Sequence, residues 1–412
     1  MYLDNKKALI NPSFRLGSSK ATSTYLLVIC IVDVMFLPYI RLLSCSLAMI
    51  IVALWHCKYA GRLLKNKSFL ILVFLMVVSL GYRLATYGLN FQIVSRAILI
   101  LYSFLFFLFF SAEIRLEVVK TLLALYIAVA LGFAVLYMLS PSQYFSIRTY
   151  WTLSSTNIIF MDMMYSRFTF IYSDPNNAGY VFDAILLYLL IFEKSSLIET
   201  VFLVGSVSVI VMVTFSVGAF ILLLLLLMAT IYVKNKDNSF CLTLITMLLL
   251  FALVMFILIM QTVNLQTAIR NDFITTLLNR VSINSGNQLG GRLAIWKDTV
   301  KNCTSLINVL FGKGSTIDKF GVEYAPHNGF LYLFFSFGFV SVCVFTRQFF
   351  TMGKRTRLSN YIPIIPLFAA VFVNTGFSDY RFISMFSLIV ACTHINSYTK
   401  RCSPLQFRDC LA

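Results

Sequence analysis

Long apolar runs, separated by short polar and basic stretches, are the main pattern along this chain. A membrane-spanning helix needs about twenty apolar residues, so each run is a candidate span. The pattern predicts one all-α, polytopic membrane domain over residues 1–412 with about 12 transmembrane helices, although several runs are short and ten or eleven spans would also fit. The twelve runs are Tyr25–Ile40, Leu42–Trp55, Phe69–Leu89, Phe91–Phe110, Val118–Leu139, Asn176–Phe192, Leu197–Phe215, Val217–Val233, Phe240–Val263, Gly329–Phe350, Tyr361–Gly376 and Tyr380–Ser397.

The composition supports a lipid environment. Hydrophobic residues make up 59% of the chain and charged residues only 12%, whereas a soluble domain is about half apolar and about a quarter charged. A water-soluble core cannot hide so large an apolar excess, so the bilayer is the expected solvent. The polar, basic N-terminal stretch lacks the small-residue pattern of a cleavage site, and we expect it to be a cytoplasmic tail.

The distribution of basic residues predicts the orientation. The formal net charge is +17, which in a soluble protein would suggest nucleic acid. With the N-terminus inside, 20 of the 33 lysines and arginines fall at the inner side, 7 lie in one long external loop and 6 at other outer positions. Long loops hardly obey the positive-inside rule, so the informative bias is 20 to 6. We therefore expect both termini in the cytoplasm and no nucleic-acid partner.

Two predicted external segments, residues 140–175 and 264–328, are too long to be simple connectors. Loops of this length are usually functional. Within the second, Arg292, Ile295 and Trp296 share one face of a predicted helix. A Trp and an Ile beside an Arg are typical of a helix that lies at the membrane interface.

Several common kinds of site are absent from the sequence. The chain has no Walker A motif, no Gly-x-Ser-x-Gly and no Asp-x-Asp, so chemistry driven by nucleotides or by metal-held sugar nucleotides is not expected. It has no Cys-x-x-Cys or His-x-x-x-His spacing, so neither a metal site nor a cofactor is predicted. The chemistry is therefore expected from polar side chains on the outer face.

Arg292 and His327 are the strongest candidates in the long loop. Arg292 follows Gly290-Gly291 at a predicted helix start, where backbone N–H groups and a guanidinium can hold a phosphate group. The alternative for Arg292 is snorkelling to lipid headgroups. His327 lies where the loop enters the next span, and a helix start there keeps the imidazole neutral and available as a base. The alternative for His327 is capping or packing.

Further external candidates flank other spans. Arg167 precedes an Asp174-Pro175-Asn176 turn that is typical of a helix cap. Asp379 and Arg381 form a short external turn and are expected to pair with each other. Asp379 is the alternative base to His327, because arginine cannot accept a proton.

Three motifs follow one another in the second half of the chain. They are Gly290-Gly291-Arg292-Leu293-Ala294-Ile295-Trp296, then Leu310-Phe311-Gly312-Lys313-Gly314, then His327-Asn328-Gly329-Phe330-Leu331 with Gly338 after it. Their combination resembles the bacterial O-antigen polymerase and ligase family, whose long external loop has a Gly/Ser-Arg before a Trp, a Phe/Leu-Gly-x-Gly and a His-Asn that opens the next span. Arg167 with the Asp174-Pro175-Asn176 turn resembles the family's earlier external element, and the resemblance covers roughly residues 160–345.

The resemblance implies a GT-C-like membrane glycosyltransferase at the periplasmic face of the bacterial inner membrane. We expect an O-antigen polymerase that joins undecaprenyl-diphosphate-linked repeat units, with a chain-length regulator protein as a further partner. His327 would be the catalytic base, and Arg292 would act both in catalysis and in diphosphate binding. The residues implied in substrate and diphosphate binding are Arg167, Arg292, Trp296, Asn328 and Arg381.

Three alternatives stay open. The family's ligases, which move finished chains to lipid A-core, often carry Ser-Arg between two mid-chain spans where this chain has Ser216-Val217, which favours the polymerase. A polymerase of capsule or exopolysaccharide would look identical. A transporter or flippase of lipid-linked glycans is the alternative of another class, but transporters place charges near the midplane, whereas here they concentrate in an external loop.

Overall fold

A computed structural model describes residues 20–37, 46–88, 91–152, 167–193, 196–214, 216–234, 296, 305–313, 328–350, 358–374, 377 and 379–399. Among these residues the regular structure is helical, and none of them lies in a strand. Five helices are long and apolar enough to cross a membrane, and further apolar helices are shorter. The chain is therefore an all-α membrane protein, as the apolar runs predicted.

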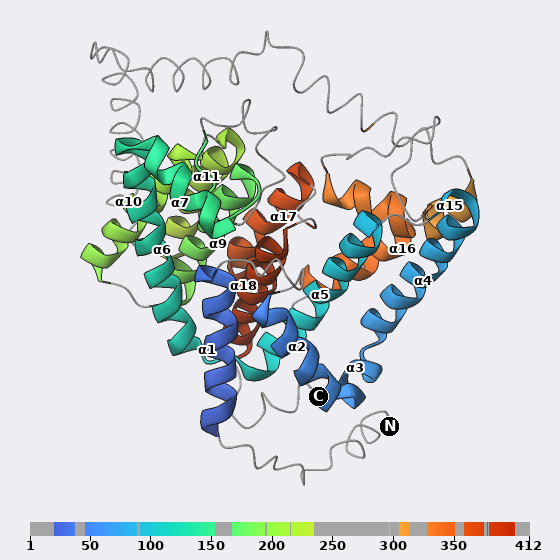
Figure 1. Cartoon of the computed structure of the whole chain (residues 1–412). Helices are drawn as coiled ribbons and strands as arrows, with labels where there is room; N and C mark the ends of the chain where they lie inside the picture. Colours follow the sequence, from blue (N-terminus) through green and yellow to red (C-terminus); the bar gives the residue numbers. More distant parts are fainter. Residues whose placement is uncertain are drawn as a thin grey trace.

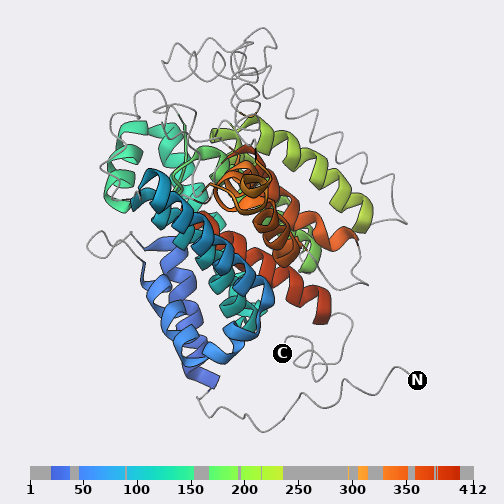
Figure 2. The same cartoon turned by 90° about the vertical axis from the view of Figure 1, so that its right-hand side faces the viewer.

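The helices follow the predicted runs closely and gather into one bundle (Figures 1 and 2). The predicted ninth run, Phe240–Val263, lies outside the described residues. The helices of the first half are α1 (Lys20–Phe36), α2 (Leu47–Lys58), α3 (Ala60–Lys65), α4 (Lys67–Tyr87), α5 (Phe91–Glu113), α6 (Leu116–Leu139) and α7 (Pro141–Thr152). The later ones are α9 (Pro175–Phe192), α10 (Leu197–Val213), α11 (Val217–Lys234), α15 (Leu306–Phe311), α16 (Gly329–Phe350), the 3-10 helix η3 (Leu358–Ile364), α17 (Ile365–Val373) and α18 (Tyr380–Thr399).

Helix α9 lies at the centre of the bundle. Nearly all of its residues are buried, and it packs against α6, α10, α11, α17 and α18. A helix that is apolar all round is expected in such a position. Small residues permit the close approach of α11: a Cβ on Gly179 would lie 2.9 Å from the Cβ of Ala219, and one on Gly218 would lie 2.6 Å from the hydroxyl of Tyr180.

Helix ends that are far apart in the sequence meet at two opposite faces of the bundle. At one face, Lys120 near the start of α6 pairs with Glu193 after α9 at 3.4 Å, and Asn360 of η3 donates to Ser397 near the end of α18 at 3.0 Å. At the other face α9, α16 and α18 begin. We call this second face the helix-start face.

Candidate functional site

The starts of α9 and α16 meet at the end of α17. Asn374, which follows α17, donates from its amide to Asn177 in the first turn of α9 across 3.5 Å. Gly329 begins α16 against the same end of α17, because a Cβ on it would lie 3.0 Å from the carbonyl oxygen of Val371 and 2.9 Å from the Phe377 ring. A Cβ here would force the side chains of Val371 and Phe377 to shift.

Asp379 joins the start of α18 to the start of α9. Its Oδ2 accepts the backbone N–H (2.8 Å) and the hydroxyl (2.9 Å) of Ser173, which lies just before α9. Its Oδ1 accepts the backbone N–H of Arg381 at 3.0 Å, which is the geometry of a helix N-cap. The contact between Asp379 and Arg381 thus runs from the backbone N–H of Arg381 to the carboxylate, in the cap geometry.

The Arg381 side chain is buried and extends toward α1. Its Nε donates to the Tyr380 hydroxyl at 3.1 Å, and its Nη2 donates to the carbonyl of Leu37 at the end of α1. Asp33 of α1 interacts with it electrostatically. Its Nη1 is buried and has no hydrogen-bond partner among the described residues. A buried N–H donor on a cation is costly unless something accepts from it, so this position is suited to an anionic ligand.

The three helix starts add to the positive potential at this place. The N-terminal end of a helix carries about half a positive charge and several backbone N–H groups that lack helical partners. Asp174 caps α9 by accepting the N–H of Asn176 at 2.7 Å. Asn328 is buried and caps α16 by accepting the N–H of Leu331 at 3.0 Å. The predicted binding residue Asn328 is thus placed at a helix start beside the end of α17.

Arg167 is also buried at the helix-start face. Its Nε donates to the carbonyl of Thr214, after α10, at 2.9 Å, and its Nη2 donates to Asn176 in the first turn of α9 at 3.2 Å. The backbone N–H of the next residue, Phe168, donates to the carbonyl of Val213 at 3.2 Å. These contacts join the segment before α9 to the end of α10, and they leave Arg167 only 4% exposed.

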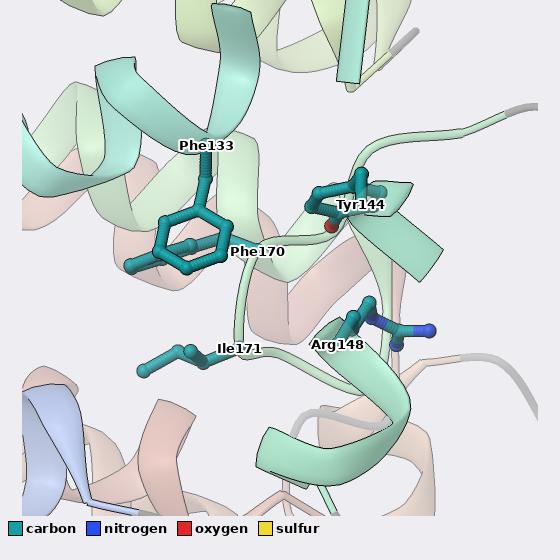
Figure 3. A pocket seen from close by; sticks show the side chains of 5 residues that line it. All are labelled: Phe133, Tyr144, Arg148, Phe170 and Ile171. Carbon is teal, nitrogen blue, oxygen red and sulfur yellow. The ribbon is translucent and has the colours of Figure 1, made fainter. Parts of the chain in front are cut away.

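The segment before α9 also forms one wall of a small pocket that the sequence did not indicate (Figure 3). The pocket lies between α6, α7 and this segment, and its lining residues are Phe133, Tyr144, Arg148, Phe170 and Ile171. Arg148 donates to the carbonyl of Tyr172 at 3.3 Å, and burial lowers its pKa from the usual arginine value while nearby Tyr144 raises it. Phe170 has a φ of +51°, a left-handed conformation that is rare for a bulky residue.

The sequence signal for the pocket was weak. Residues 140–175 were predicted only as an external segment, whereas α7 occupies its beginning and residues 167–174 are mostly buried. The pair Ser140-Pro141 could have indicated a helix start, since proline is favoured in the first turn. The aromatic packing around Phe170, which includes Tyr126, Phe133 and Phe182, cannot be read from a single sequence.

Two of the predicted loop residues, Arg292 and His327, lie outside the described residues. Trp296 is described, and its ring packs against the ring of Phe372 in α17 with centroids 5.5 Å apart. The Phe372 side chain is half exposed. The contact places Trp296 against the same helix, α17, whose end adjoins the starts of α9 and α16.

The second motif docks on a kink in α16. Gly338 interrupts α16 with a φ of +83°, and Gly312 after α15 has a φ of +78°. A Cβ on Gly312 would lie 2.5 Å from the backbone nitrogen of Phe337, and one on Gly338 would lie 1.9 Å from the carbonyl oxygen of Leu310. Lys313 then donates its backbone N–H to the carbonyl of Phe335 at 2.7 Å. Two glycines therefore permit a direct junction of the two backbones.

Comparisons with known proteins give no family assignment: no protein-family model matches the chain, and no curated protein matches it. The site is thus described by its geometry alone. Of the predicted residues, Arg167, Asn328, Asp379 and Arg381 lie at the helix-start face. Trp296 packs against the adjoining helix α17. No group of three or more His, Cys, Asp or Glu side chains that could hold a metal ion occurs within the described part of the chain.

Proposed function

We propose that this chain is a membrane glycosyltransferase that polymerises undecaprenyl-diphosphate-linked repeat units into O-antigen polysaccharide. The proposal rests chiefly on the buried Arg381 guanidinium, which keeps one N–H donor without a partner among the described residues where α9, α16 and α18 begin. A diphosphate on a lipid anchor suits this position: its tail stays in the bilayer while helix starts and a guanidinium meet its phosphate groups.

The proposed reaction is a glycosyl transfer. A hydroxyl at the non-reducing end of one lipid-linked repeat unit attacks the anomeric carbon of the growing chain on a second lipid. The bond from that carbon to the diphosphate oxygen breaks, undecaprenyl diphosphate leaves, and the hydroxyl proton passes to a base. His327 is the proposed base, and it directly precedes Asn328 in the chain. The leaving group brings its own energy, so the reaction needs no nucleotide.

Positive groups in fixed positions are the proposed means of stabilising the leaving diphosphate. Arg292 is the proposed clamp in the long loop, and Arg381 and Arg167 are proposed at the helix-start face. Preorganised donors at the position where charge develops commonly supply the largest part of catalysis. Asn328 and Trp296 are proposed to help hold the substrate, Asn328 at the start of α16 and Trp296 against α17.

The proposed setting is the bacterial inner membrane, with twelve spans, both termini in the cytoplasm and the helix-start face toward the periplasm. The bias of 20 inner to 6 outer basic residues supports this orientation. A periplasmic site matches a substrate whose glycan has already crossed the membrane. A chain-length regulator is the proposed protein partner, because a polymerase that stays on its product needs a limit on the number of additions.

Loss of the gene tests the proposal. We expect the mutant to carry single repeat units on lipid A-core in place of long chains, as seen on a gel of its surface glycan, with a plasmid copy restoring the ladder. Absence of attached repeats together with accumulated long lipid-linked chains would instead identify a ligase. Single units that accumulate on the cytoplasmic side would identify a flippase.

Substitution Arg292→Lys is expected to lower chain extension about tenfold or more, because lysine keeps the charge but loses the planar fork that binds two phosphate oxygens. The matched control is Arg347→Lys, since Arg347 is exposed in the last turn of α16, away from the helix-start face. The measurement is the distribution of chain lengths at equal protein levels. A normal distribution in Arg292→Ala would remove Arg292 from the proposed site.

A further inference from the structure

The short helix α15 contacts a candidate membrane span well inside its apolar stretch. The hydroxyl of Ser79 in α4 donates to the carbonyl of Phe311 at the end of α15. Ser79 lies seven residues before the end of the candidate span Lys67–Thr86, which corresponds to about 10 Å along the helix axis. Figure 1 shows α15 alongside the upper end of α4. The end of α15 is therefore level with an apolar part of α4.

The second contact of α15 lies at a similar depth in α16. Gly338 interrupts that helix nine residues after the start of the candidate span Gly329–Phe349, or about 13 Å along its axis. Gly312, directly after α15, lies against the backbone of this kink. The hydrocarbon core of a bilayer is about 30 Å thick. Both contacts therefore lie at the depth of acyl chains when α4 and α16 span the membrane.

Backbone groups at this junction pair within the protein. The Lys313 N–H donates to the carbonyl of Phe335 at 2.7 Å, and the carbonyl of Gly338 accepts the hydroxyl of Ser341 at 2.7 Å. Gly312 itself is buried. Irregular backbone occurs at membrane depth only where protein or a water-filled cavity supplies its hydrogen bonds, because lipid offers none. The junction meets this requirement through contacts of its own.

The side of α15 that turns away from the bundle is apolar and exposed. Leu306 is 74% exposed and Ile307 67% exposed, Leu310 is exposed as well, and the helix has neither a buried nor a charged residue. Such a surface is costly in water and has no such cost in lipid. Val77 of α4 lies close to Ser79 in the chain and is 64% exposed, so α4 has a lipid-facing surface at the same depth.

We propose that α15 inserts into the bilayer, with Leu306, Ile307 and Leu310 against acyl chains. Six residues span only about 9 Å, so α15 cannot cross the membrane. Trp296 before it packs near the end of α17, and Asn328 after it caps α16 at the helix-start face. The insertion is therefore re-entrant, and it fastens the predicted long loop to the membrane.

Two further points define the scope of this insertion. Lys313, just after the junction, is compatible with it, because a lysine stem can carry its ammonium toward the headgroups. The insertion depends on no glycan and on no enzyme activity, so it goes beyond the proposed function. It also corrects the expectation that the whole of residues 264–328 is an aqueous loop.

Tryptophan fluorescence in brominated lipid tests the inference. The purified full chain with Ile307→Trp is reconstituted in phosphatidylcholine with or without bromine on the acyl chains, since bromine quenches a tryptophan that it touches. The wild type, with its three tryptophans, gives the background. We expect the added fluorescence to fall in brominated lipid as far as that of Val77→Trp, the matched lipid-facing control, and to resist iodide supplied on both sides of the membrane.

Leu306→Trp is the second test position, and it should behave like Ile307→Trp, because both side chains are exposed and a larger one fits there. Quenching by iodide would place α15 in water or at the interface, and quenching by neither agent would show that protein covers the helix. Either result at both positions overturns the insertion. Chain extension is not part of this measurement, so its outcome leaves the polymerase proposal to its own tests.

Discussion

His327→Ala is expected to abolish long chains while the protein still inserts in the membrane. A sugar hydroxyl is a poor nucleophile, and a positioned general base typically contributes about 10²–10⁴-fold. Of the three histidines, His56 and His394 are buried in helices and bonded to the carbonyls of Leu105 and Phe349, toward the face opposite the helix starts. His327 is thus the histidine left for the proposed site. The measurement is the chain-length distribution on a gel, at protein levels matched by immunoblot.

Two further variants make this prediction specific. His327→Gln should not restore long chains, because glutamine keeps a polar head group but cannot take the proton. Binding of undecaprenyl diphosphate should survive in His327→Ala and weaken in Arg292→Ala, since the first variant loses a base and the second loses a phosphate ligand. Near-normal polymer from His327→Gln would show that the residue only orients or caps, and the base would then have to be sought at Asp379.

Gly338→Ala is expected to destabilise the protein by about 2–6 kcal/mol. With φ at +83° and ψ at 168°, Gly338 lies in a backbone region almost confined to glycine, which costs another residue about 1–3 kcal/mol. An added atom in a packed contact costs about 1–3 kcal/mol more. The Cβ would lie 1.9 Å from the carbonyl oxygen of Leu310, so α15 would have to leave the kink in α16. Thermal unfolding of the purified protein in detergent measures the loss, and chain extension should fall with it.

Gly132→Ala is the matched control for this change. Gly132 lies inside α6, and a Cβ on it would meet no atom within 4 Å. Alanine also has the higher helix propensity, by about 1 kcal/mol. The control should therefore be as stable as the wild type or slightly more so. Equal melting temperatures for the Gly338 and Gly132 variants would show that the junction of Gly312 and Gly338 is not as tight as described.

The helical framework could largely be predicted from the sequence, because a lipid solvent demands long apolar runs with internally satisfied backbones. The run predicted from Asn176 to Phe192 corresponds to α9 almost residue for residue. Helix α7 was missed for the same reason: it is too polar to stand out as an apolar run, and its start is marked only by Pro141. The kink at Gly338 depends on a partner backbone from α15, which local pattern cannot supply.

The site was predictable only in part. The sequence singled out Arg167, Asp379 and Arg381 as candidates, but it did not indicate that the contacts of Asp379 run to Ser173, more than 200 positions earlier. Such contacts depend on how whole helices pack, and one sequence carries no direct signal for them.

Reconstitution tests the central claim most directly. The purified chain is placed in liposomes with undecaprenyl-diphosphate-linked single repeat units, without nucleotide, and the products are resolved by gel and mass spectrometry. The account predicts a ladder of lipid-linked glycans at whole multiples of the repeat, with one undecaprenyl diphosphate released for each unit added, and no ladder from His327→Ala. Single units that remain unextended, whether they stay in place, cross the bilayer or move only onto added lipid A-core, would contradict it.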